Sequence, residues 1–157
     1  MRLGIKKFSL FVNLSVIASI ISSVSIMACA FLGKSDNIDQ VIKIIFPLVF
    51  WIGLLIEQYF IWNANSFRKK LESEGKLRRI RGKPGAVSIL QTEEGAIADL
   101  ILVISLIVFV ILLLFGIGKG FPQYLFIFFV VLSFRMHCIL NGKNFRYKKY
   151  LAKRKVD

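Results

Sequence analysis

The chain has 157 residues, of which 56% are hydrophobic, and its formal net charge is +13. A soluble domain of this length cannot bury so much apolar surface, so the composition excludes the ordinary soluble globular class and indicates a membrane protein. The positive charge would also suit nucleic acid, but the sequence contains no nucleic-acid recognition module, and we expect no nucleic acid among its partners.

Four apolar stretches of the sequence are long enough to cross about 30 Å of hydrocarbon as helices. Their residues are 8–32, 41–62, 96–115 and 122–140. We therefore predict an all-α, polytopic integral membrane protein in which four transmembrane helices form one bundle, a single membrane domain over residues 1–157. A cytoplasmic basic loop at 63–95 and a cytoplasmic basic tail at 141–157 complete this domain.

The first stretch has features of both a leader peptide and a retained span. Residues 26–29 loosely resemble a lipoprotein cleavage box, in which cleavage would leave Cys29 at the new N-terminus. The apolar run is longer than the roughly 7–15 residues of a leader's core, so we expect the segment to be retained. Ser15, Ser19 and Ser23 share one helical face, which predicts close packing against another helix of the same chain rather than against a second copy.

The segment between the second and third stretches carries several local signals. We expect the second helix to continue beyond the membrane and to break at Gly75. The short apolar run 86–90 cannot span, and we expect it either on the inner membrane surface or beneath the bundle. Thr92 is a good N-cap for the third helix, because its hydroxyl can accept a hydrogen bond from a backbone N–H of the first turn.

The third and fourth stretches are joined by the glycine-rich sequence GIGKGFP, residues 116–122. This composition predicts a tight helical hairpin. We expect the fourth helix to continue through Asn141 into the basic tail, with Gly142 as a weak point.

Cations gather before the first stretch, between the second and third, and after the fourth. This alternation follows the positive-inside rule and predicts that both termini and the middle loop are cytoplasmic. The same cations should attract anionic lipid headgroups. The residues expected to contact headgroups are Arg68, Lys69, Lys70, Arg78, Arg79, Arg81, Lys148, Lys149, Lys153, Arg154 and Lys155.

The sequence lacks the common signatures of catalysis and of metal binding. A single histidine excludes a multi-histidine metal site within one chain, and there is no P-loop, CxxC motif or dinucleotide fingerprint. Cys29 and Cys138 are expected near opposite leaflets, too far apart for a disulfide. We therefore predict a protein with no catalytic residues, no metal and no cofactor.

Ionisable and amide side chains from three of the stretches are expected at one depth, in the cytoplasmic third of the bundle. This candidate polar cluster comprises Glu57, Gln58, Asp99, Arg135, His137 and Asn141. It either forms a pocket for a substrate, proton or ion, or stabilises the packing of the helices.

Two contacts are expected within this cluster. Arg135 either reaches to the interface or, as we favour, pairs with Glu57 or Asp99. His137 points away from Arg135 on the helix, so we expect it to face Asn141 or lipid headgroups rather than the same acid.

The segments RGKPGAVSIL (81–90), EEGAIADL (93–100) and MHCILNGKNFRY (136–147) resemble small four-span membrane proteins of Gram-positive bacteria that carry no assigned activity. The resemblance covers the middle loop and the last two stretches. It implies no mechanism, and with it we expect the location to be a bacterial plasma membrane.

Three classes of function fit these features. We favour a small non-enzymatic accessory, regulatory or immunity-type protein that acts through another membrane protein. The second class is a small oligomeric transporter or channel that uses the polar cluster, since four helices leave little room for a path through one chain. The third is a membrane enzyme acting on lipid headgroups.

Overall fold

The computed structural model of the chain describes residues 2–32, 40–75, 87–115 and 121–153. Within these ranges the secondary structure is helical, in agreement with the predicted all-α class. The helices are α1 (Arg2–Leu32), α2 (Gln40–Ser73), α3 (Glu93–Leu114), α4 (Phe121–Leu140) and α5 (Lys143–Lys153). Each predicted apolar stretch lies within one of the helices α1 to α4, with Phe115 as the C-cap of α3.

Three helices of the described chain, α1, α2 and α3, are long and apolar enough to cross a membrane. A fourth is added if α4 and the bent helix α5 are counted together. These helices indicate a multi-pass membrane protein.

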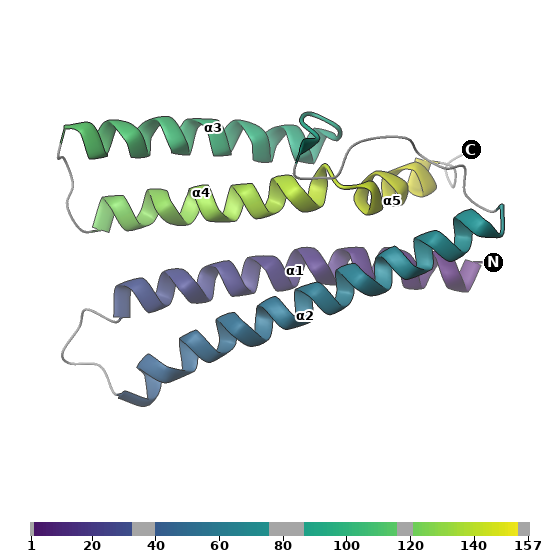
Figure 1. Cartoon of the computed structure of the whole chain (residues 1–157), viewed down its shortest axis with the longest axis horizontal. Helices are drawn as coiled ribbons and strands as arrows, with labels where there is room; N and C mark the ends of the chain where they lie inside the picture. The colour runs from purple at the N-terminus through teal and green to yellow at the C-terminus, as the bar shows by residue number, and fades with distance from the viewer. Residues whose placement is uncertain (1, 33–39, 76–86, 116–120, 154–157) are drawn as a thin grey trace.

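The four long helices lie side by side in a row (Figure 1). The extensive contacts join α1 to α2, α3 to α4, and α1 to α4. α1 and α4 therefore occupy the middle of the row, while α2 and α3 lie at its edges. This arrangement is more open than a bundle closed around a central axis.

The serine-rich face of α1 packs within the chain, as predicted. Ser15, Ser19 and Ser23 are buried, and the hydroxyls of Ser15 and Ser23 donate to backbone carbonyls one turn earlier. A Cβ placed on Gly53 of α2 would lie 2.9 Å from the Cβ of Ser22. Small residues therefore face each other across this pair, which allows the two backbones to approach closely.

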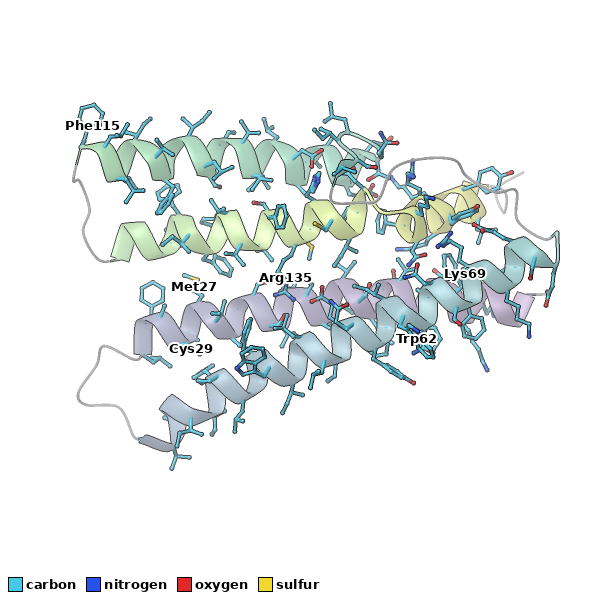
Figure 2. The ribbon with its side chains drawn as sticks, viewed as in Figure 1. Met27, Cys29, Trp62, Lys69, Phe115 and Arg135 are labelled. Carbon is cyan, nitrogen blue, oxygen red and sulfur yellow. The ribbon has the colours of Figure 1, made fainter. Side chains whose placement is uncertain are left out.

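The helix α2 is about 51 Å long at 1.5 Å per residue, well beyond the roughly 30 Å of a hydrocarbon core. It ends at Ser73, and Gly75 adopts a φ of 66°. The predicted continuation of the helix past residue 62 and its break at Gly75 are both confirmed. Trp62, which lies at the start of the extension, is exposed (Figure 2).

The buried apolar core lies at one end of the row rather than along its middle. Its residues are Phe8 and Val12 of α1, Ala64 and Leu71 of α2, and Phe145 and Tyr147 of α5. Burial of apolar side chains stabilises a structure where water is the alternative, whereas lipid tails are as apolar as the side chains themselves. A buried apolar core at this end is the kind of packing that contact with water stabilises, and we call this end of the row the polar end.

The fourth helix does not continue into the basic tail, contrary to our prediction. α4 ends at Leu140, and α5 begins at Lys143 after a bend of 59°. A Cβ on Gly142 would lie 2.9 Å from the carbonyl oxygen of Ile139, so a larger residue could not adopt this turn without displacement. The bend lets Phe145 and Tyr147 enter the core, which supplies the physical reason for the break.

Candidate functional site

The predicted polar cluster separates into two groups on different sides of α4. One group joins α4 to α1 and α2, and the other joins α4 to α3. We call them the arginine cluster (Arg135, Glu57 and Ser23) and the histidine cluster (His137, Asp99 and Asn141). A common depth was predictable from sequence, but the order of the helices in the row places the two acids apart.

In the arginine cluster, Arg135 pairs with Glu57, one of the two acids predicted as its partner. The Nη1 atom of Arg135 also donates to the Oγ atom of Ser23, with a distance of 2.8 Å between them. Figure 2 shows Arg135 on the side of α4 that faces α1. The relative exposures of the two charged side chains are 15% for Arg135 and 7% for Glu57, so the pair is largely withdrawn from solvent.

Ser23 is the member of the arginine cluster that sequence reasoning did not assign. Its hydroxyl accepts from Arg135 and donates to the carbonyl oxygen of Ser19, 2.8 Å away. The serine spacing predicted a packing face, and a serine on that face can also bind a cation. One guanidinium thereby links three helices.

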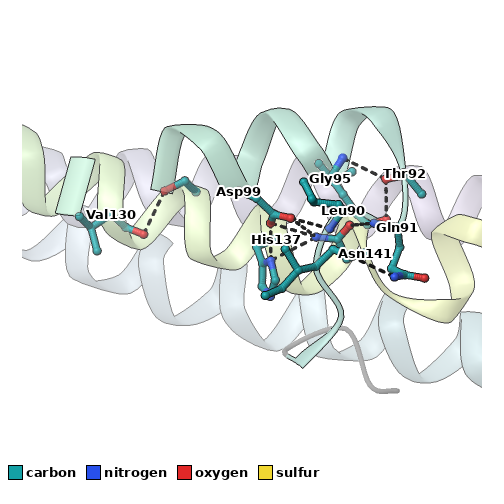
Figure 3. A network of polar contacts seen from close by, with 11 residues as sticks. Leu90, Gln91, Thr92, Gly95, Asp99, Val130, His137 and Asn141 are labelled. Carbon is teal, nitrogen blue, oxygen red and sulfur yellow. Dashed lines mark hydrogen bonds and ion pairs between the residues drawn. The ribbon is translucent and has the colours of Figure 1, made fainter. Parts of the chain in front are cut away.

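In the histidine cluster, Asp99 contacts the Nδ1 atom of His137, and the Nδ2 atom of Asn141 donates to Asp99 at 3.0 Å (Figure 3). The predicted contact between His137 and Asn141 is confirmed, at 3.1 Å. The contact between His137 and Asp99 was not predicted. All three side chains are buried, and Asn141 is fully so.

The histidine cluster also binds the chain just before α3. The backbone N–H of Leu90 donates to Asp99 at 2.8 Å, and that of Gln91 donates to the side-chain oxygen of Asn141 at 3.0 Å. These bonds hold Leu90 at a φ of 54°, a left-handed conformation that costs an L-residue about 1–2 kcal/mol.

Thr92 completes this junction. Its hydroxyl accepts from the N–H of Gly95 at 2.9 Å, which confirms the predicted N-cap, and donates to the carbonyl oxygen of Leu140 at 3.1 Å. A side chain at Gly95 would overlap the amide of Asn141, so glycine is required for this approach. The described part of the short apolar run, 87–90, thus docks on the ends of α3 and α4, while Val87, Ile89 and Leu90 remain exposed.

Gln58, the remaining member of the predicted cluster, is exposed and belongs to neither group. It lines a cavity of about 490 Å³ that lies among α1, α2, α4 and the start of α5. Arg135 and Glu57 also line this cavity. Arg135 and Glu57 thus both join helices and line a cavity. The same pair therefore fits the interpretation as a ligand pocket and the interpretation as a packing contact.

Several of the cations expected at headgroups contact protein groups in the structure. The Nζ atom of Lys149 lies 2.5 Å from a carboxylate oxygen of Glu94, and this hydrogen bond raises the pKa of Lys149. The Nζ atom of Lys148 lies 2.5 Å from the side-chain oxygen of Asn13. Burial lowers the pKa of Lys148.

Arg68 has the most contacts of these cations. It donates to Asn144 of α5 at 2.9 Å and pairs with Glu72 at 3.0 Å. Lys69 and Lys70 are exposed. Arg78, Arg79, Arg81, Arg154, Lys155 and the side chain of Lys153 lie outside the described residues.

Cys29 and Cys138 are both free thiols. Among the described residues, no group of three or more His, Cys, Asp or Glu side chains is placed to hold a metal ion. Comparisons with known protein families, with curated proteins and with solved structures found no match for the chain.

Proposed function

We propose that the chain is a small non-enzymatic protein of a bacterial plasma membrane, and that it acts by binding another membrane protein as an accessory, regulatory or immunity-type subunit. In this proposal α1 to α4 span the bilayer and both termini are cytoplasmic. The cation pattern supports this orientation. The N-terminus of α1 and the helix α5 lie at the same end of the row (Figure 1), which is consistent with an even number of spans.

The observation that carries the proposal is the position of α3 at the edge of the row. Among the helices, α3 packs extensively only against α4. Its buried residues are Gly95, Ala98, Asp99 and Ser105, and the rest of its length presents long apolar side chains such as Ile104, which is 51% exposed. Lipid tails can cover such a face, and so can a helix of a partner, which would bind through packing.

The buried charges support the same proposal. Both acids within the apolar stretches 41–62 and 96–115 have partners inside the chain: Glu57 binds Arg135, and Asp99 binds His137 and Asn141. These contacts fix the order and rotation of the helices, which is the role expected of a rigid binding scaffold.

A second candidate is an oligomeric transporter or channel, and the cavity that reaches Arg135 and Glu57 favours it. A transported ion or proton would have to separate that pair. In that case several copies of the chain would have to assemble, because the helices α1 to α4 lie in a row and not around a common centre.

Photo-crosslinking in intact membranes tests the proposal. A photoreactive amino acid at Ile104 of α3 should give a discrete adduct with a different membrane protein. The matched control is Ile17 of α1, which is 50% exposed but belongs to a helix in the middle of the row. Adducts with lipid alone at both positions would contradict the proposal, and an adduct between two copies at Ile104 would favour the second candidate.

A further inference from the structure

The cavity of about 490 Å³ is a groove between α2 and α4, with α1 at its floor and the first turn of α5 at its polar end. Its volume falls within the range of about 300–1,000 Å³ that is typical of small-molecule sites. It runs from Glu57 to Arg68 along α2, a length of about 16 Å at 1.5 Å per residue.

Charge is distributed unevenly along this groove. At its deep end Arg135 is neutralised by Glu57. At its polar end the lining includes Arg68 and Lys143, and Glu57 is the sole acid among the lining residues of the described chain. Arg68 forms an ion pair with Glu72, but Lys143 has no acidic partner within ion-pair distance in the described residues.

The groove also borders the N-terminal turn of α5, which contributes Lys143, Asn144 and Phe145 to its lining. The first backbone N–H groups of a helix have no partner within the helix, and the helix dipole makes this end positive. The polar end of the groove thus combines two cations with a helix terminus of the same sign.

Between its two ends the groove is mostly apolar, although Ser15, Gln58 and Asn65 also line it. Ile61 of α2 lies on one wall, and Phe134 and Ile139 of α4 lie on the other. A ligand that fits this lining has an anionic group and a hydrocarbon chain. A free phosphate would leave the apolar walls in contact with water.

We propose that this groove binds the headgroup of an anionic phospholipid. The phosphate lies at Arg68 and Lys143, beside the first turn of α5, and the glycerol and the start of one acyl chain follow the walls formed by Ile61 and Ile139. Such a site differs from general attraction to the basic surface, because it depends on the cations that line the groove and not on those elsewhere at the polar end.

Native mass spectrometry of the full chain in detergent tests this site. The probes are phosphatidylglycerol, phosphatidylcholine and glycerol 3-phosphate. Phosphatidylglycerol should bind more tightly than either phosphatidylcholine or glycerol 3-phosphate. Lys143→Gln should weaken its binding about fivefold, as expected from about 1 kcal/mol per cation near a lipid surface.

The matched control is Lys69→Gln, which removes an exposed cation of the same end that does not line the groove. Its binding of phosphatidylglycerol should equal that of the unaltered chain. An equal loss for Lys69→Gln and Lys143→Gln would overturn the site in favour of general attraction. Equal binding of phosphatidylcholine would overturn the requirement for negative charge, and equal binding of glycerol 3-phosphate would overturn the lipid assignment.

A second measurement uses the thiol of Cys138, which lines the groove. In a Cys29→Ser background, a maleimide should alkylate Cys138 more slowly when phosphatidylglycerol is added, and phosphatidylcholine should leave the rate unchanged. This readout needs no substitution in the lining. A rate that does not respond to phosphatidylglycerol would overturn the site independently of the variants.

Discussion

Arg135 is the residue at which three helices meet. Its guanidinium pairs with Glu57 of α2 and donates to Ser23 of α1 while its own backbone belongs to α4. An ion within an apolar helix is costly unless it is paired, and removal of one partner leaves the other charge uncompensated. Arg135 and Glu57 therefore each need the other as a counter-ion, and the guanidinium also donates hydrogen bonds that the carboxylate and Ser23 can accept.

We predict that Arg135→Leu lowers the melting temperature and the folded yield in detergent, because Glu57 then lacks a counter-ion. The loss should be on the order of 3–5 kcal/mol, as for other broken buried pairs. Adding Glu57→Gln should recover part of it. Thermal unfolding followed by size-exclusion chromatography measures both quantities.

The control for this prediction is Arg135→Leu combined with Asp99→Asn. Asp99 contacts His137 and Asn141 rather than Arg135, so this combination should recover nothing. If Arg135→Leu alone leaves melting and yield unchanged, the ion pair does not stabilise the fold, and Arg135 instead extends to the interface.

At this scale the sequence predicted that an acid meets Arg135, but it could not choose between Glu57 and Asp99. Depth follows from the helical rise and can be counted along the chain. The rotation of each helix and the order of the helices depend on packing between residues far apart in sequence. For the same reason, Asp99 as a partner of His137 and Ser23 as a partner of Arg135 were not foreseen.

Among the elements, α1 and α2 share the most extensive contact in the described chain. Their contact depends on small residues, because the Cα of Gly53 faces Ser22 with no room for a larger side chain. In lipid the hydrophobic effect does not drive helices together, so close approach and the resulting van der Waals contact are the main stabilising terms.

We predict that Gly53→Ala lowers the melting temperature, since the added methyl group would lie 2.9 Å from the Cβ of Ser22 and must separate the helices. Overpacking of this kind costs about 1–3 kcal/mol, which exceeds the roughly 1 kcal/mol by which alanine favours a helix. The matched control is Gly4→Ala in α1, where nothing lies within 4 Å of the added Cβ. Equal melting temperatures for the two variants in detergent would contradict close packing at Gly53.

At Gly142 the prediction of the fourth helix was wrong. The sequence marked it as a weak point, but a helix that continued through it was still expected. The break follows from long-range contacts, in which Phe145 and Tyr147 of α5 join Phe8 of α1 in the core. By contrast, Thr92 and Gly75 act through neighbouring residues, and both were predicted correctly.

At the scale of the whole molecule, the two ends of the row differ in composition. The polar end has an apolar core of its own, the α2 extension and the helix α5, whereas the middle of the row exposes long apolar side chains. Hydrophobic runs were sufficient to predict the four long helices, and charge was sufficient to predict an orientation. Neither the hydrophobic runs nor the charge pattern could predict the order of the helices in the row.

The measurement that tests this account most directly is cysteine labelling in intact cells with a maleimide that does not cross membranes. The background is Cys29→Ser with Cys138→Ser, and single cysteines are placed at the two ends of the row, as Phe115→Cys and Ser73→Cys. Both positions are exposed. We predict that Phe115→Cys is labelled in intact cells and that Ser73→Cys is labelled only after the cells are broken. Labelling of Ser73→Cys in intact cells would contradict the proposed orientation, with the polar end and both termini in the cytoplasm.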